Sequence, residues 1–405
     1  MIHFFSRLTS FQHKKGVLFC FGLFLSLFLF GQPNMGETKR PKLVVGIVVD
    51  QMRWDFLYRY ANRYGNDGFK RLLREGFSCE NTMIPYTPTI TACGHTCVYT
   101  GSVPAVHGIV GNNWYSRELN RTVYCTDDTT EKTVGSASAE GEMSPRNMLT
   151  TTIGDELKLA TNFRSKVVGI AIKDRGAILP AGHAANATYW YDGTVGKFIS
   201  STYYMDSLPG WVNRFNEQGL PSQYMQKGWQ TLYPVNTYTQ STPDEESYEG
   251  RFSNESSSSF PHALKGSAKA PFEILASSPF GNTYTLEFAK TVIQNDHLGS
   301  NGVTDMLCVS ISSTDYVGHQ FGPNSVEAED TYLRLDKDLA LFFQYLDKTI
   351  GKNEYTVFLT ADHGAINAHG FLEEHKLPGG SFNEKTVKTK LDSLLQSQGI
   401  SKGII

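Results

Sequence analysis

The chain has 405 residues, of which 40% are hydrophobic and 12% aromatic, and its formal net charge is -3. This length and apolar content allow a large buried core and exclude a disordered chain. The small net charge excludes a broad basic field, so we expect no nucleic-acid partner, and any phosphate recognition must come from a few placed cations.

Residues 1–31 have the layout of a secretory signal peptide. Basic residues that include Arg7, Lys14 and Lys15 precede an apolar run over residues 17–30, and this order is typical of such signals. The run is shorter than the about 20 residues that span a bilayer comfortably. An anchor retained in the membrane is the alternative, because no clear cleavage site follows. We predict that the segment is removed, that the mature chain has no stable membrane association, and that it is periplasmic or secreted.

Five cysteines follow the signal segment, namely Cys79, Cys93, Cys97, Cys125 and Cys308. An oxidising compartment allows up to two disulfides among them, and we expect Cys308, which lies in an apolar run, to stay a buried free thiol. Cys93, His95 and Cys97 are residue types that bind zinc. Thiols this close in an exported protein more often pair or stay buried, so we expect no zinc there.

Four continuous apolar runs predict strands, over residues 43–49, 167–172, 306–311 and 355–359. Continuous rather than alternating apolarity is typical of strands buried on both faces of a sheet. Helical patterns lie between them, and the clearest covers residues 325–348. Strands that alternate with helices predict an α/β fold, with a largely parallel sheet flanked by helices.

The amino-acid composition changes between residues 182 and 270, where tyrosine, glycine and serine become frequent. This composition indicates hairpins and exposed loops. We predict an inserted cap or substrate region over 182–270. The α/β core then consists of residues 40–181 and 271–405.

Each predicted strand is followed by polar residues: Asp50, then Lys173 with Arg175, then Asp315 with His319, then Asp362 with His363. In open parallel sheets, sites form at the carboxyl ends of the strands. One such residue alone is better explained as a helix cap or a surface charge. The convergence of all four groups predicts a functional site.

The types and spacing of these residues favour a pair of zinc ions. The pairs Asp315 with His319 and Asp362 with His363, together with Asp50, offer the oxygen and nitrogen ligands that zinc accepts. Two zinc ions about 4 Å apart stabilise the attacking and departing oxygens of a phosphoryl displacement.

Thr91 is the expected nucleophile, since it lies at a predicted turn into a helix. Free backbone N–H groups and the helix dipole favour an anion there. Pro88 restricts the preceding segment, and the small Ala92 and Gly94 permit close approach. Taken alone, Thr91 is no stronger a candidate than the other threonines nearby.

The sequence resembles the alkaline phosphatase superfamily, and within it the threonine-nucleophile, phosphate-irrepressible (PafA-type) alkaline phosphatases. The resemblance covers nearly all of the predicted mature chain and rests on VVGIVVDQMRWDFLYRY, NTMIPYTPTITACGHTCVYTGSVPAVHGIVGNNW, IAIKDRGAILPAGH, SSTDYVGHQFGPNS and TADHGA. It implies that Asp50, Asp362, His363 and Thr91 hold one zinc ion. It also implies that Asp315 and His319 contribute to the second.

The resemblance further implies that Asn112, Lys173 and Arg175 contact phosphate. An amide, an ammonium and a guanidinium suit the non-bridging oxygens of a monoester dianion, and two cations favour monoesters over diesters. The alternative for the two cations is a surface turn. Sulfate esters are disfavoured, because the C/S-x-P-x-R motif of sulfatases is absent near Thr91. We expect the neighbouring His95 and His107 to be structural.

One departure from the family pattern concerns the second zinc ion, for which a further histidine is required well towards the C-terminus. After His363 the sequence has only His369 and His375, which match the segment just downstream of the Asp-His-Gly motif. We therefore expect the C-terminal part of the core to be missing from this chain and the second zinc site to be incomplete.

The sequence as a whole predicts an exported, two-zinc phosphate monoester hydrolase that acts on small phosphate monoesters through a phosphothreonine at Thr91. Two alternatives stay open. One is a nucleotide pyrophosphatase or phosphodiesterase with the same nucleophile and metals, and the other is an inactive metal-binding remnant.

Overall fold

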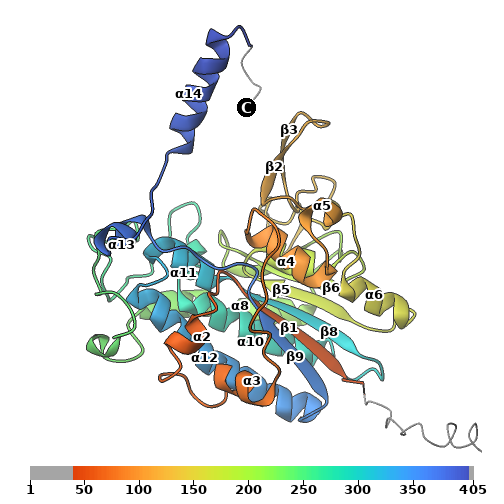
Figure 1. Cartoon of the computed structure of the whole chain (residues 1–405). Coiled ribbons are helices and arrows are strands. Elements are labelled where there is room, and N and C mark those ends of the chain that lie inside the picture. Colours follow the sequence, from red (N-terminus) through yellow and green to blue (C-terminus); the bar gives the residue numbers. More distant parts are fainter. Residues whose placement is uncertain (1–39, 401–405) are drawn as a thin grey trace, which may run out of the picture. The chain divides into compact units, whose positions relative to one another are not determined.

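A computed structural model describes residues 40–400 (Figure 1). The predicted signal peptide, residues 1–31, lies outside the described residues. Within the described part of the chain, no helix is both long and apolar enough to cross a membrane.

A seven-stranded sheet forms the centre of the fold, with the strand order β4-β7-β6-β5-β8-β1-β9. The strands are β1 (Leu43–Val49), β4 (Thr133–Val134), β5 (Val167–Ala171), β6 (Ala187–Asp192), β7 (Lys197–Ser201), β8 (Asp305–Ile311) and β9 (Tyr355–Thr360). The pairs β6–β5, β5–β8, β8–β1 and β1–β9 are parallel, and the pairs of β7 with β6 and β4 are antiparallel. The predicted α/β class with a largely parallel sheet is confirmed.

The helices are α2 (Phe56–Arg59), α3 (Phe69–Glu75), α4 (Thr91–Thr100), α5 (Pro104–His107), α6 (Ile153–Ala160), α7 (Asp174–Ala181), α8 (Gly210–Glu217), α9 (Leu220–Lys227), α10 (Pro279–Asn295), α11 (Ser313–Phe321), α12 (Val326–Leu346), α13 (His369–Glu374) and α14 (Glu384–Ser397). A small hairpin of β2 (Asn113–Ser116) and β3 (Arg121–Tyr124) stands beside α4 and α5 (Figure 1).

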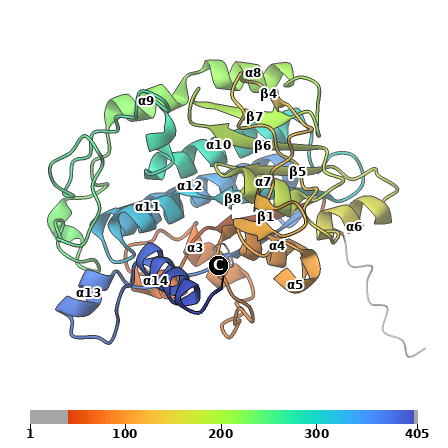
Figure 2. The ribbon, with the colours of Figure 1, turned by 90° about the horizontal axis from the view of Figure 1, so that it is seen from above.

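The two faces of the sheet are covered by different helices. Val45 and other alternate residues of β1 pack in one cluster with Leu339 of α12 and residues of α10. Val48 points to the opposite face and packs with Tyr99 of α4 and Ala181 of α7. Figure 2 shows α10 and α12 on one side of the sheet and α4, α6 and α7 on the other. Strands buried on both faces explain why the predicted runs are continuously apolar.

The predicted insertion at residues 182–270 needs a correction, because its first part belongs to the core sheet. β6 and β7 form the expected hairpin, with Trp190 opposite Ile199. β6 also pairs in parallel with β5, with Val168 opposite Ala187. The segment outside the sheet follows β7 and carries α8, α9 and long loops. It is fixed to α12 where Asp330 accepts hydrogen bonds from Trp229 Nε1 at 2.8 Å and Leu232 N at 2.6 Å.

All five cysteines of the described chain are free thiols, so the structure contains neither of the two disulfides considered from the sequence. Cys308 is fully buried in β8, as expected. Cys93 and Cys97 lie one turn apart on α4 and contact the Ile109 carbonyl and the His107 ring respectively.

Candidate active site

The carboxyl ends of four neighbouring strands bring the predicted polar residues together. The Lys173 ammonium, after β5, donates to Asp50 Oδ2 at 2.7 Å and to Asp315 Oδ2 at 2.5 Å. The same nitrogen lies 3.3 Å from Thr91 Oγ1. All four residues are buried. Side chains more than 200 residues apart in the chain therefore share one centre.

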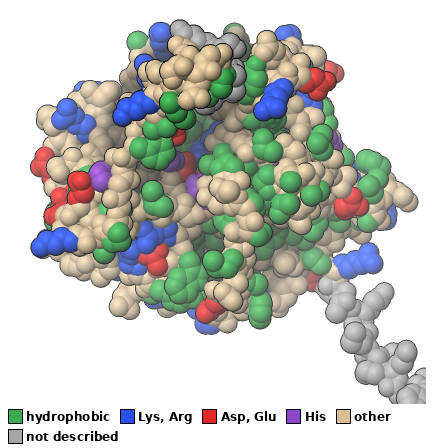
Figure 3. All heavy atoms as spheres, turned by 45° about the horizontal axis from the view of Figure 1, so that its top comes forward, with side chains coloured by type: hydrophobic (Ala, Val, Ile, Leu, Met, Phe, Trp, Pro, Cys, Tyr) green, Lys and Arg blue, Asp and Glu red, His purple; other side chains and the backbone are tan. Residues whose placement is uncertain are grey.

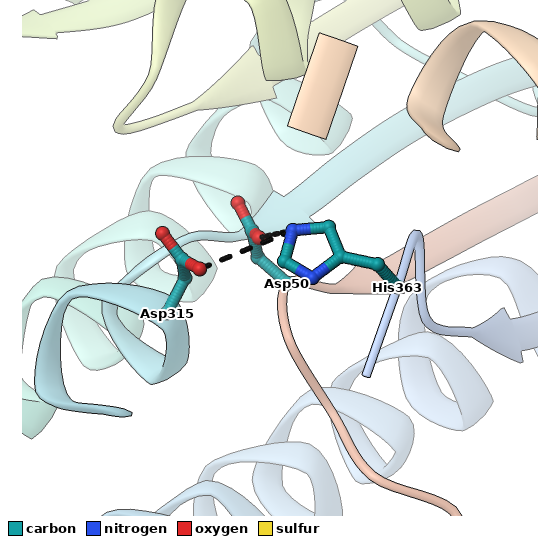
Figure 4. A group of neighbouring side chains, drawn as sticks. All are labelled: Asp50, Asp315 and His363. Carbon is teal, nitrogen blue, oxygen red and sulfur yellow. Dashed lines mark ion pairs between the residues drawn. The ribbon is translucent and has the colours of Figure 1, made fainter. Parts of the chain in front are cut away.

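Three side chains at this centre have the arrangement of a metal site. One ligand atom each from Asp50, Asp315 and His363 lie within 4.8 Å of one another (Figure 4). His363 Nε2 is 3.4 Å from Asp50 Oδ1 and 4.0 Å from Asp315 Oδ1. The buried Asp50 Oδ1 has no hydrogen-bond partner, and such an atom is expected where a cation binds. These residues therefore fit a divalent cation, and they combine ligands that the sequence assigned to two adjacent ions.

Asp362 connects this centre to α4. Its Oδ1 accepts hydrogen bonds from Gln51 N at 3.1 Å and His363 N at 2.9 Å. Its Oδ2 is buried without a hydrogen-bond partner and lies 3.1 Å from His95 Nδ1. A Cβ atom on Gly94 would lie 2.3 Å from the Asp362 carbonyl oxygen. A glycine at position 94 is therefore required for α4 to approach this carboxylate.

His319 forms the outer edge of the centre. It lies one turn after Asp315 on α11, with Nε2 3.2 Å from Asp315 Oδ1, and its side chain is 73% exposed. His369 and His375 lie on or beside α13, where they contact Glu373 and the Phe371 carbonyl. Neither of them has a contact with the Asp315–His319 pair.

Thr91 begins α4, as predicted, and it is 3% exposed. The preceding Ile90 is extended, and no side chain caps the helix. The N–H of Ala92 donates to Asn112 Oδ1. The dipole and the other first N–H groups of α4 are available to an anion next to the Thr91 hydroxyl.

Of the three residues expected to contact phosphate, Lys173 contacts Thr91 directly, Asn112 contacts the adjacent Ala92, and Arg175 follows β5 two residues after Lys173. Asn112 Oδ1 accepts a hydrogen bond from Ala92 N at 3.0 Å, which leaves its amide N–H groups to donate elsewhere. Arg175 lies in the first turn of α7, where Nη1 donates to Tyr124 at 2.9 Å and the buried Nε has no partner. Lys173, engaged with two carboxylates, is the cation nearest to the Thr91 oxygen.

Burial and charge shift the pKa values at the centre in different directions. Burial opposes ionisation of Asp50, but Lys173 and His363 outweigh it and hold its pKa well below the usual value. Burial and the Asp50 carboxylate raise the pKa of Asp362. Against the effect of burial, the nearby Asp50 and Asp362 carboxylates raise the pKa of His363 to about 9. Three close carboxylates with one buried ammonium leave an excess of negative charge, which a cation would offset.

Gln51 is a site residue that the sequence did not reveal. Its Nε2 donates to Asp315 Oδ1 at 2.7 Å, and its N–H donates to Asp362, so it connects two candidate ligands. Its φ of 65° is unusual for a residue other than glycine. Its only sequence signal is its position next to Asp50. His95 is buried and bonded to Ser310 Oγ and the Thr91 carbonyl, and His107 is buried and bonded to Ile109 N, so both have structural partners.

A cavity lies in the loops next to the site. In the space-filling view, acidic and histidine side chains are visible within a hollow of the molecule (Figure 3). A cavity of about 600 Å³ is lined by residues 53–55 and 364–367, in the loops that follow Asp50 and His363, and by Leu372. None of the candidate ligands lines this cavity, so it adjoins the site through these two loops.

Comparison with known proteins identifies relatives of the whole described fold. A family model for type I phosphodiesterase / nucleotide pyrophosphatase matches residues 44–392. The chain is 63% identical over 356 residues to the alkaline phosphatase PhoV of Synechococcus elongatus, an alignment that covers 88% of this chain and 64% of PhoV. The crystal structure of wild-type alkaline phosphatase PafA superimposes with a TM-score of 0.85 at 51% identity, over 89% of this chain and 69% of that one.

A second PafA structure superimposes equally well, with a TM-score of 0.85 at 52% identity over 87% of this chain and 69% of the other. That protein is a mutant in which a threonine, an asparagine, a lysine and an arginine are substituted. The chain thus spans about two thirds of the length of these relatives.

Proposed function

Because the chain belongs to the type I phosphodiesterase / nucleotide pyrophosphatase family, we propose that it is an exported, metal-dependent phosphate monoester hydrolase, an alkaline phosphatase that acts on small monoesters. The observation that carries this proposal is the Thr91 hydroxyl at the start of α4, 3.3 Å from Lys173 Nζ and beside the Asp50–Asp315–His363 group. The similarity to PhoV and PafA, both named alkaline phosphatases, supports it.

Two zinc ions would complete the centre. Asp50, Asp362 and His363, together with Thr91, would hold one, and Asp315 with His319 would contribute to the other. The unpartnered oxygens of Asp50 and Asp362 support this assignment. When bound, zinc supplies a Lewis acid that stabilises negative charge on the attacking and departing oxygens.

Thr91 Oγ1 is the nucleophile in this proposal. A bond forms between Oγ1 and phosphorus, and the bond from phosphorus to the ester oxygen breaks with its electron pair going to the departing alcohol. Water then cleaves the phosphothreonine, so the two displacements retain configuration at phosphorus. The ammonium of Lys173 favours the deprotonated Thr91 oxygen, because it is held 3.3 Å away by two carboxylates.

The chain's donors fit a phosphoryl group with several charged oxygens. The free N–H groups at the start of α4, the amide of Asn112 bonded to Ala92 and the guanidinium of Arg175 would supply donors to its oxygens. The residues substituted in the PafA mutant, a threonine, an asparagine, a lysine and an arginine, have the same types and order as Thr91, Asn112, Lys173 and Arg175. This agreement supports their assignment to the nucleophile and the phosphate contacts.

The family description favours one second candidate, a nucleotide pyrophosphatase or phosphodiesterase. Two cations near Thr91 favour the monoester, since a diester presents one charge fewer. Steady-state turnover of matched aryl monoesters and diesters by the zinc-loaded chain, measured beside its zinc content, tests the choice. A higher kcat/KM for the diester would overturn it, and zinc binding without turnover of either ester would favour the inactive metal-binding remnant.

A further inference from the structure

Tyr124, the last residue of β3, connects Arg175 to a fixed carboxylate. Arg175 Nη1 donates to the Tyr124 hydroxyl at 2.9 Å, and that hydroxyl donates to Asp174 Oδ1 at 2.7 Å. Thr126 Oγ1 donates to the other oxygen, Asp174 Oδ2, at 2.5 Å. The nearest approach of Arg175 Nη1 to Asp174 Oδ1 is 3.8 Å. Tyr124 is therefore the group that contacts the guanidinium directly, and Asp174 acts on it through the tyrosine.

The same hairpin fixes the second predicted phosphate ligand. Tyr124 lies opposite Asn113 in the β2–β3 register, and the adjacent Cys125 N donates to the Asn112 carbonyl at 2.9 Å. The side chain of Asn112 in turn accepts from Ala92 N, next to the nucleophile. The base of one hairpin thus holds Asn112 and Arg175 in a fixed relation to the start of α4.

The Tyr124 hydroxyl keeps its proton where an alkaline phosphatase works. Burial, assisted by the negative charge of Asp174, raises its pKa well above the usual value for tyrosine. A protonated phenol accepts one hydrogen bond from a guanidinium while it donates another to a carboxylate. Both contacts are therefore compatible with alkaline solution.

We propose that Tyr124 is a positioning residue that directs Arg175 towards the non-bridging oxygens of a phosphate monoester and so contributes to the preference for monoesters over diesters. This inference rests on the proposed function. Arg175 has a free Nε–H and three further N–H donors beyond the bond to Tyr124, so the guanidinium keeps donors for the substrate.

The test is Tyr124→Phe in the zinc-loaded chain, which removes one hydroxyl and keeps the ring. We expect kcat/KM for an aryl phosphate monoester to fall about tenfold, the loss of one hydrogen bond to a charged group, while that for the matched diester changes little. In an Arg175→Ala background the same substitution should have no further effect, because the residue acts through that guanidinium. Tyr115→Phe is the control, since this 60% exposed tyrosine of the same hairpin bonds only to Asn120.

Binding of inorganic phosphate, measured by calorimetry for the wild type, the three single variants and the double variant, separates this inference from the proposed function. If the wild-type chain hydrolyses neither ester, the proposed function fails, and the binding data still decide the role of Tyr124. The positioning role is supported if Tyr124→Phe weakens phosphate binding in the wild-type background and has no effect on it in the Arg175→Ala background. Equal losses on monoester and diester, additive losses in the double variant, or unchanged phosphate binding overturn it.

Discussion

Gly94 offers a sharp test of how α4 is fixed to the metal ligands. An added Cβ would lie 2.3 Å from the Asp362 carbonyl oxygen and 2.6 Å from Asp362 Cβ. This is about 1 Å inside ordinary contact distance, and two of the nearest atoms belong to the backbone, so no side-chain rotation relieves the clash. Gly94→Ala therefore requires α4 and the Asp362 segment to move apart.

The expected effect on stability is small, and the expected effect on turnover is large. Alanine in place of glycine favours a helix by about 1 kcal/mol, whereas overpacking a buried contact costs about 1–3 kcal/mol. The net destabilisation is then about 0–2 kcal/mol. A shift of about 1 Å between nucleophile and ligands costs on the order of 100-fold in rate. Activity should thus fall far more than stability.

The assay compares thermal unfolding, zinc affinity and monoester turnover of Gly94→Ala with those of the wild type. Gly380→Ala is the control, because a Cβ at that position meets nothing within 4 Å. A Gly94→Ala protein that is more stable than the wild type and keeps its turnover would refute the reasoning, since it would show that α4 and Asp362 do not need this close approach.

Four further outcomes are expected. Thr91→Ala should abolish monoester hydrolysis while Thr91→Ser retains part of it, and wild-type turnover by the alanine variant would remove Thr91 as the nucleophile. Replacing Lys173 and Arg175 together by alanine should reduce monoester turnover far more than diester turnover, since each charged contact contributes about 1.5–3 kcal/mol, and equal losses would contradict the monoester preference. The second zinc site offers His319 and one carboxylate, where catalytic zinc usually has three protein ligands, so metal analysis after dialysis should find about one zinc per chain; two tightly held ions would show that another residue completes the site. Burial and a neighbouring carboxylate raise the pKa of Glu249 from 4.5 to about 8, so its protonated form stabilises the fold fully below pH 4.5 and this contribution is lost as the pH rises through about 8. Above pH 8 the Glu249→Gln protein should therefore have a free energy of unfolding about 1–2 kcal/mol larger than that of the wild type, and in acid the two values should match. Equal melting temperatures at alkaline pH would show that this carboxyl group titrates normally.

The strands and the start of α4 were predictable because local sequence determines them. The apolar run 43–49 coincides with β1, and α12 begins after Ser325, whose hydroxyl accepts from Ala328 N as a helix cap. Thr91 follows an extended residue and opens α4, as the turn-to-helix pattern predicted. The choice of Thr91 over the neighbouring threonines depended on the other motifs and on the family resemblance.

The boundary at residue 182 was not predictable in the same way. β6 is rich in tyrosine and tryptophan, and a hairpin with such residues is equally compatible with a separate cap. Its assignment to the core depends on the parallel pairing with β5, which requires the chain to return along α7. Tertiary pairing decided this point, and no local pattern encodes it.

The connections within the site also depend on the three-dimensional structure. Gln51 reaches Asp315 and Asp362 across sequence separations of 264 and 311 residues, and its positive φ has no sequence signal. Tyr124 meets Arg175 from 51 residues away. Sequence reasoning found the charged candidates through their residue types, and it missed the neutral residues that orient them.

The location of Lys173 bears on whether the protein folds before or after it binds metal. Its ammonium pairs with both Asp50 and Asp315, so the protein carries an internal counter-ion that offsets part of the negative charge at this centre. Small zinc-dependent domains stay unfolded until the metal arrives, because binding supplies most of their folding free energy. This fold contains part of the compensating charge in its own sequence, so we expect that the chain can complete its core first and bind metal afterwards.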